Sequence, residues 1–253
     1  MVADDPTPYD EFEPGATLSS PDRVPESIVP VGFLDDLKRQ AEAAKAQHST
    51  DDRLLARNAA LADAAAKTVN DYFMVLAQQL NVLRPRSKVA YRLDRRHVYT
   101  DLQLCDFRDD ARRKRLRGED AYDHVVLRWR LASGTPLALT KNFLPDIEQL
   151  EARLRQGGIR VDADAVRRPD SAKLQEMRYE FVADFHATAL VTPDHDHGRL
   201  RFELANLDGL ETVSVEFPAF EVGQTRLDEL ARWILGEPNG FLKDGQNLRR
   251  VEP

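Results

Sequence analysis

The spacing of the apolar residues changes at residue 88, and this change constrains the fold more than any other feature of the chain. Before it, apolar residues recur at three- and four-residue steps, as on one face of an α-helix; after it, they alternate with polar residues, as along a half-buried strand. We therefore predict one α+β domain over 33–242, with a helical part over 33–84 and a sheet-rich part over 86–242. The predicted fold is a long N-terminal helix followed by antiparallel meander sheets with helices packed on their apolar face.

The helical part is predicted to contain two helices. The first covers about 34–46, and the second opens at Ser49, which with Asp52 forms a variant of the capping box. Pro85 ends the second helix, because proline cannot continue a helical backbone.

Apolar residues of the second helix form one stripe with nearly heptad spacing. Two interpretations are open: the stripe packs on the chain's own sheet, or it pairs with another chain, which would make helix 51–83 the interface of a homo-oligomer. The stripe consists of Leu55, Ala62, Val69, Tyr72, Leu76, Leu80 and Leu83.

Strands and two capped helices follow. The joins between strands are rich in Pro, Asp, Asn and Gly, which favours antiparallel hairpins. Helices are predicted at about 145–156 and 225–235, each followed by glycine, and the stretch 162–172 is expected to be a polar link. Strands are predicted over 88–93, 98–107, 125–131, 137–140, 179–191, 200–204 and 213–217.

Both ends of the chain are predicted to lie outside the folded domain. Residues 1–32 are rich in proline and form an acidic, flexible tail, in which residues 1–30 carry seven acidic side chains against a single arginine, a net charge of −6. Residues 243–253 are polar and are expected to form a loose C-terminal tail.

The charge reverses sharply in the middle of the chain. Residues 84–117 hold twelve Lys and Arg against five Asp, a local charge of +7 in a protein whose formal charge is −7. Such a separation creates a field that attracts an anionic partner. The predicted partner-binding residues are Arg84, Arg86, Arg92, Arg95, Arg96, Arg112, Arg113, Lys114, Arg115 and Arg117.

These residues fall into two groups. The first lies at the helix exit, on the first strand and in its turn at 94–97; the second lies in the long loop predicted over 108–120. Consecutive hairpin turns alternate between the two ends of a sheet, so the groups are expected at opposite ends. The favoured partner is an acidic protein surface, with the chain's own N-terminal tail as one candidate; nucleic acid is the alternative. Nearby aromatic residues alternate as core residues do, which disfavours base stacking.

Signs of catalysis are weak. Asp194-His195-Asp196-His197 could ligate a metal and Asp184 with His186 could form an acid–base pair, but a solvated turn and the wet face of a sheet are the favoured interpretations. The sequence has no glycine-rich phosphate loop, GxGxxG or GxSxG motif. We therefore expect no metal, cofactor or catalytic residue, although a metal-dependent or acid–base enzyme stays a second alternative.

The chain lacks the basic start and apolar run of a signal peptide, and it has no stretch of roughly 20 apolar residues that would span a bilayer. We expect no membrane insertion and a cytoplasmic location. The predicted function is that of a non-enzymatic binding or adaptor (scaffold) protein. Its own acidic tail is expected to modulate binding to the basic surface.

Overall fold

The computed structural model describes residues 32–171 and 173–253. The chain divides into two units between Gln47 and His48, and the described part of the first unit is 32–47. Apart from Gly32, the predicted acidic tail lies outside the described residues, so its predicted character is not addressed by the structure.

A single continuous helix, α1 (Phe33–Leu83), replaces the two helices predicted for the helical part. The predicted break near residue 48 is wrong because no glycine or proline occurs between Phe33 and Leu83. A residue that favours helix caps, such as Ser49, lowers the stability of a helix interior by only about a few tenths of a kcal/mol. It therefore does not end the helix. Helix α1 ends at Leu83, and the next residue, Arg84, has a left-handed backbone (φ +44°) directly before Pro85.

The predicted stripe of α1 packs on the chain's own sheet. Val69 and Leu80 of the stripe belong to the shared core together with Phe73 and Ala77, and Tyr72 and Leu76 pack against that core. The first of the two interpretations is therefore confirmed. Pairing of α1 with another chain stays a prediction. The large apolar side chains exposed within 51–83 are Leu54, Leu61, Met74, Val75, Val82 and Leu83.

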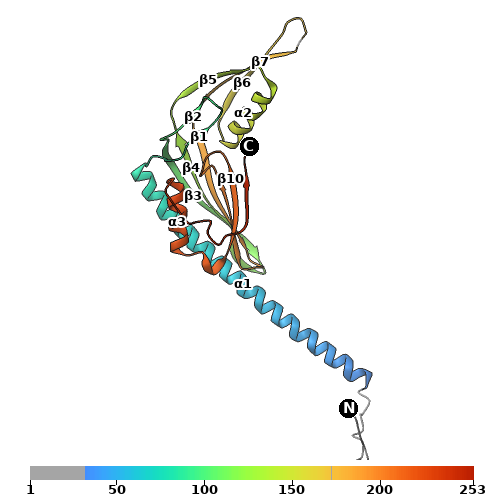
Figure 1. Ribbon diagram of the computed structural model, residues 1–253. Helices are drawn as coiled ribbons and strands as arrows, with labels where there is room; N and C mark the ends of the chain where they lie inside the picture. The colour runs from blue at the N-terminus through green and yellow to red at the C-terminus, as the bar shows by residue number, and fades with distance from the viewer. Residues whose placement is uncertain (1–31, 172) are drawn as a thin grey trace, which may run out of the picture. The chain divides into compact units, whose positions relative to one another are not determined.

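Six antiparallel strands form the main sheet, in the order β11-β10-β9-β8-β4-β3. Helices α1 and α3 (Gln224–Ile234) cover one face of it, with the short 3₁₀ helix η1 (Ala219–Glu221) leading into α3 (Figure 1). The α+β architecture with antiparallel sheets is thus as predicted. The strands are β3 (Gln103–Leu116), β4 (Glu119–Ala132), β8 (Phe185–Asp194), β9 (Arg199–Ala205), β10 (Thr212–Pro218) and β11 (Gln246–Val251).

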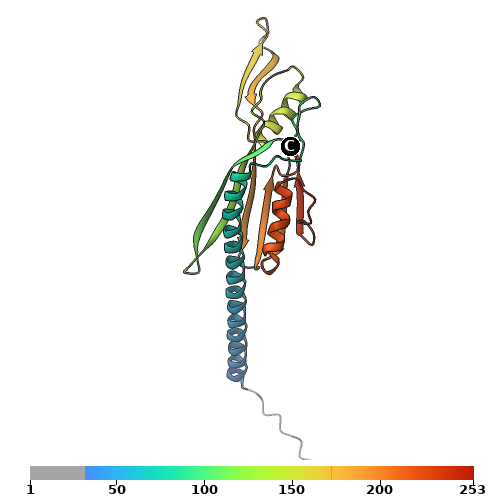
Figure 2. The same cartoon turned by 90° about the vertical axis from the view of Figure 1, so that its left-hand side faces the viewer.

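A smaller layer lies at one end of the main sheet, and the tip of the β3–β4 hairpin lies at the other (Figure 2). The smaller layer contains a three-stranded sheet of order β5-β7-β6 and helix α2. A two-stranded pair, β1–β2, adjoins it. The bounds are β1 (Tyr91–Arg92), β2 (Val98–Tyr99), β5 (Pro136–Lys141), α2 (Leu144–Gln156), β6 (Val161–Arg167) and β7 (Leu174–Val182).

One buried side chain ties the smaller layer to the main sheet. The side-chain amide of Asn206 donates hydrogen bonds of 2.7 Å to the backbone carbonyls of Gln156, at the end of α2, and His186, on β8. The Tyr91 hydroxyl donates to the backbone carbonyl of Asn206 at 2.9 Å. Because buried polar groups are costly when unpaired, these bonds fix where β1 and α2 lie.

Several segments differ from the sequence prediction. The predicted strand 179–191 is split into β7 and β8, which belong to different sheets, because Asp184 turns the chain by accepting hydrogen bonds from the backbone of Ser133 and Gly134. The predicted strand 98–107 is likewise divided between β2 and β3.

Three other segments predicted to lack regular structure are strands. Most of the predicted loop 108–120 belongs to β3 and β4, the predicted link 162–172 contains β6, and the predicted loose tail 243–253 contains β11. All three are edge segments whose side chains are largely exposed, so backbone pairing forms them without an apolar pattern.

Among the residues described, no helix is both long and apolar enough to cross a bilayer.

Candidate partner-binding site

The structure separates the predicted binding residues into two groups at opposite ends of the main sheet (Figures 1 and 2). The helix-exit group follows α1 and continues through β1 into the β1–β2 turn. The hairpin group lies near the tip of the β3–β4 hairpin. The helix-exit group is Arg84, Arg86, Arg92, Arg95 and Arg96; the hairpin group is Arg112, Arg113, Lys114, Arg115 and Arg117.

The hairpin group stands on a two-stranded ribbon and not in a loop. Strand β4 pairs with β8 only from Val125 onward, so residues 112–124 continue beyond the main sheet as β3 paired with β4. Arg117 occupies the turn with a left-handed backbone (φ +50°), a conformation that non-glycine residues adopt at a cost.

Carboxylates neutralise most of the hairpin group. Arg113 lies 3.3 Å from Asp120 and stacks over the Tyr122 ring at 4.5 Å. Lys114 lies 3.1 Å from Asp123 on the neighbouring strand.

Arg117 pairs with Asp196 of the β8–β9 turn, so a third member of the group is also compensated. Only Arg112 and Arg115 of this group make no ion pair with a described residue. The hairpin end therefore offers an anion little uncompensated charge.

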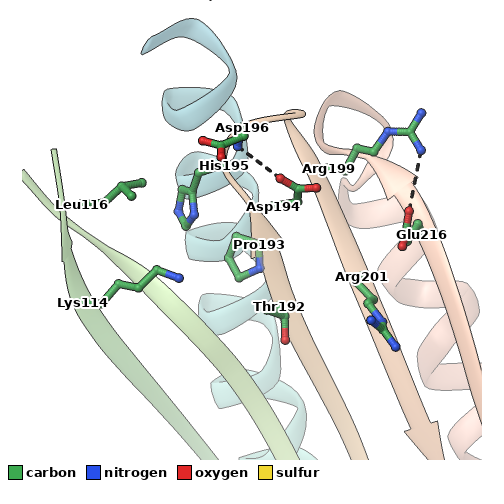
Figure 3. Close-up of a pocket in the computed structure, with 10 residues that line it drawn as sticks. All are labelled: Lys114, Leu116, Thr192, Pro193, Asp194, His195, Asp196, Arg199, Arg201 and Glu216. Atoms are coloured by element: carbon green, nitrogen blue, oxygen red, sulfur yellow. Dashed lines mark hydrogen bonds and ion pairs between the residues drawn. The ribbon is translucent and has the colours of Figure 1, made fainter. Parts of the chain in front are cut away.

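A pocket of about 390 Å³ lies beside this ribbon. Figure 3 shows the imidazole of His195 directed toward Lys114 and Leu116 of β3. His195 is 5% exposed and its Nε2 has no partner in the described structure. Burial lowers the pKa of His195 and the charge of Lys114 lowers it further, so the ring is neutral at pH 7.

The charges that line this pocket balance. Its lining includes three cationic and three acidic side chains, so it carries no net attraction for an ion of either sign. They are Lys114, Arg199, Arg201, Asp194, Asp196 and Glu216.

The polar groups of the Asp194–His197 segment form hydrogen bonds with one another. Asp194 accepts hydrogen bonds from the backbone of Asp196 and His197 at 3.2 Å and from the His197 ring at 2.8 Å. Over residues 32–171 and 173–253, no group of three or more His, Cys, Asp or Glu is arranged to hold a metal ion. The segment is an ordinary turn by its contacts.

Asp184 and His186 do not form an acid–base pair in the structure. The Asp184 carboxylate accepts a hydrogen bond of 2.8 Å from Arg130 in addition to those from the backbone at 133 and 134. His186 is exposed on β8, opposite Arg130 in the neighbouring strand. The carboxylate thus serves the turn between the two sheets.

The helix-exit group contributes to a larger cleft of about 740 Å³. We call it the cationic cleft. It is lined by residues 92–97 of the β1–β2 segment, residues 139–141 at the end of β5, and Phe143, Asp146, Gln149, Leu150 and Arg153 at the start of α2 and along it.

Asp94 holds the β1–β2 turn in place at the centre of this cleft. Its carboxylate accepts hydrogen bonds of 2.8 Å from the backbone N–H of Arg96 and His97, from the His97 ring and from the Lys141 ammonium. Burial alone would raise the pKa of Asp94, but these hydrogen bonds, first the one from Lys141, outweigh burial and hold the pKa well below its ordinary value. The carboxylate is therefore ionised and fully engaged.

None of the four arginines that line the cleft makes an ion pair with a described residue, and Arg153 donates a hydrogen bond of 3.0 Å to the backbone carbonyl of Leu93. The other three are Arg92, Arg95 and Arg96. The cleft as a whole holds five Lys and Arg against two Asp, a net charge of +3. Uncompensated like charges gathered on one concave surface focus the field there, which is how a protein attracts an anionic ligand.

The remaining members of the helix-exit group lie outside the cleft lining. Arg86 pairs with Asp101 at 3.0 Å, and Arg84 is exposed at the end of α1. Sequence reasoning missed Lys141, Phe143 and Arg153, which line the cleft from segments some way along the chain. Lys141 and Arg153 are isolated charges in the sequence, and the exposure of Phe143 is visible only in the structure, so no sequence pattern marks these three residues.

Comparison with known proteins identifies no relative of the chain. No protein-family model matches it, and no curated protein or solved structure matches it significantly. The function has to be argued from the geometry of the site alone.

Proposed function

We propose that this chain is a non-enzymatic binding or adaptor protein whose cationic cleft engages an acidic segment of a partner protein. The observation that carries the proposal is the gathering of Arg92, Arg95 and Arg96, without ion partners among the described residues, on one cleft of about 740 Å³. This volume lies within the roughly 300–1,000 Å³ of typical ligand sites. Carboxylates of an extended segment would meet the arginines as charge-assisted hydrogen bonds.

Two features favour an acidic protein over nucleic acid. The hairpin group is largely neutralised by its own carboxylates, so no continuous basic track joins the two ends of the sheet. The cleft lining contains one aromatic ring other than histidine, Phe143, where a single-stranded nucleic acid would use several for stacking.

A peptide-binding measurement tests the proposal. The probe is a fluorescent peptide with the sequence of residues 4–14, DDPTPYDEFEP, which carries five carboxylate side chains. Its binding to the full-length chain is followed by fluorescence anisotropy. The double variant Arg95→Glu/Arg96→Glu should bind it at least about tenfold more weakly, since two attractive pairs become repulsive.

Two controls accompany this measurement. Arg112→Glu/Arg115→Glu changes the net charge of the chain by the same amount at the hairpin end and should leave the affinity within about twofold. A peptide whose carboxylates are replaced by amides should not bind. Equal losses for the two double variants would show general charge attraction and would overturn the cleft as the site.

A mixed-sequence oligonucleotide provides the comparison with nucleic acid. The proposal predicts weaker binding of the oligonucleotide than of the peptide at physiological salt. Tighter oligonucleotide binding with a steep dependence on salt concentration would contradict the proposal, because such a slope reports contacts with several phosphates.

Modulation by the N-terminal tail stays a prediction. Deleting residues 1–30 removes seven acidic side chains and one arginine, and it should increase binding of the acidic peptide at low salt. Unchanged binding would contradict the modulatory role and leave the role of the cleft untouched.

A further inference from the structure

We infer that the acidic segment taken by the cationic cleft carries an aromatic or large aliphatic side chain beside its carboxylates, and that Phe143 is the residue that receives it. The inference rests on the proposed function and names the kind of partner that the cleft accepts. It starts from Phe143, which is one of the residues that line the cleft.

Phe143 contributes little to folding. Its side chain is 60% exposed, and the neighbouring Leu144 is 58% exposed, so two large apolar side chains stand together in water. Adjacent exposed apolar groups of this size mark interaction surfaces more often than isolated ones do.

The position of Phe143 in the fold makes its identity more unusual. It is the N-cap residue of α2 and makes no side-chain hydrogen bond to the helix. Ser, Thr, Asp or Asn would stabilise the helix start by accepting a backbone N–H there. Phe143 therefore provides no capping hydrogen bond and also exposes its ring. Contact of the ring with a partner would account for both features.

The ring belongs to the same concave surface as the arginines. Phe143, Arg95 and Arg96 all line the cationic cleft, and Leu93 and Leu150, both buried, belong to the same lining. One short extended segment can therefore place carboxylates on the arginines and an apolar side chain on Phe143 together. Burying the two apolar groups against each other adds affinity that charge alone does not provide, and aromatic pairs add geometric preference.

Charge complementarity determines the occupant. A wholly apolar ligand would leave Arg92, Arg95 and Arg96 without partners, and a wholly acidic one would leave Phe143 in water. A segment with both kinds of side chain satisfies the two parts of the surface at once.

The test compares three peptides with the full-length chain. The first is DDPTPYDEFEP; the second has alanine in place of both aromatic residues, Tyr9→Ala/Phe12→Ala; the third has amides in place of the carboxylates. The second peptide should bind about tenfold more weakly than the first, and the third should not bind detectably.

Variants of the protein locate the effect. Phe143→Ser should weaken the first peptide by about the same factor, and it should cause no further loss with the alanine peptide, because the two substitutions remove one shared contact. Phe220→Ser is the matched control, since Phe220 is 76% exposed on η1 and does not line the cleft; it should behave as the unsubstituted chain.

The outcomes separate the two proposals. If the alanine peptide binds as tightly as the first peptide, and Arg95→Glu/Arg96→Glu still abolishes binding, the inference about Phe143 is overturned and the proposed function stands. If Phe220→Ser weakens the first peptide as much as Phe143→Ser does, the inference is also overturned. If none of the peptides binds either the unsubstituted chain or the chain without residues 1–30, the proposed function itself fails and the inference with it.

Discussion

Replacing Asp94 by asparagine should destabilise the protein far more than the same change at Asp146, although both residues line the cationic cleft. Asp94 accepts four hydrogen bonds of 2.8 Å, two from backbone N–H groups, one from His97 and one from Lys141. Asp146 is exposed and accepts no side-chain hydrogen bond from the described residues. The pair of variants therefore isolates what the engaged carboxylate contributes.

The magnitude follows from burial and charge. Hydrogen bonds to a charged group are worth about 1.5–3 kcal/mol each, but they are not additive within one cluster. The side chains of Lys141 and Asp94 are 21% and 16% exposed, so solvent screens their attraction in part. We expect Asp94→Asn to lower the free energy of unfolding by about 2–4 kcal/mol, and Asp146→Asn to change it by no more than about 0.5 kcal/mol.

Urea unfolding followed by circular dichroism measures both values, and its dependence on pH gives a second check. The pKa of Asp94 is lower in the folded state than in the unfolded chain, so the folded state binds fewer protons. The stabilisation by Asp94 is then fully present above about pH 4 and is lost as the pH falls further. Equal stability of the two variants at pH 7 would refute this account of the turn.

Three further predictions concern other parts of the chain. Because burial lowers the pKa of His195, stability should fall below about pH 6.5 by up to about 1.4 kcal/mol per pH unit, and His195→Gln should remove that component; an unchanged pH profile in urea unfolding would contradict it. Asn206→Ala leaves the carbonyls of Gln156 and His186 without their donor and should cost about 2–4 kcal/mol, measured in the same way; a loss under about 1 kcal/mol would count against the tie between layers. Arg84→Gly relieves the strain of a left-handed backbone and should raise the free energy of unfolding by up to about 1 kcal/mol, seen as a slightly higher melting temperature. A lower melting temperature would contradict this.

The sequence predicts those elements of the fold that bury one regular face. Strand β8 illustrates this, because Phe185, Ala187, Ala189 and Val191 are all buried and alternate with half-exposed or exposed residues. The apolar stripe on α1 is a second example, because it packs on the main sheet of the same chain. Periodic burial leaves a periodic sequence, which is why the change of spacing at residue 88 locates the boundary between helix and sheet.

Edge strands cannot be predicted from apolar periodicity in this way. The outer half of β3 carries Arg112, Arg113, Lys114 and Arg115 in succession, and β11 is exposed throughout, yet both are paired through their backbones. Backbone pairing depends on a neighbouring strand and leaves no apolar pattern in the sequence.

The candidate site could be predicted only in part, for a related reason. Local charge identifies the arginines, but it does not show that Asp196, far along the chain, pairs with Arg117, or that Lys141 and Asp94 together fix the β1–β2 turn. Which positive charges remain uncompensated is a property of tertiary contacts. The distinction between the hairpin group and the cationic cleft therefore needs the structure.

Hydrogen exchange of the full-length chain with and without the peptide DDPTPYDEFEP tests the central claim most directly, because it reports where the ligand lies. Bound peptide should slow amide exchange in residues 91–99 and 139–153, which carry the lining of the cationic cleft, and should leave residues 108–117 of the hairpin unchanged. Slower exchange confined to residues 108–117 would contradict the assignment of the cleft as the binding site.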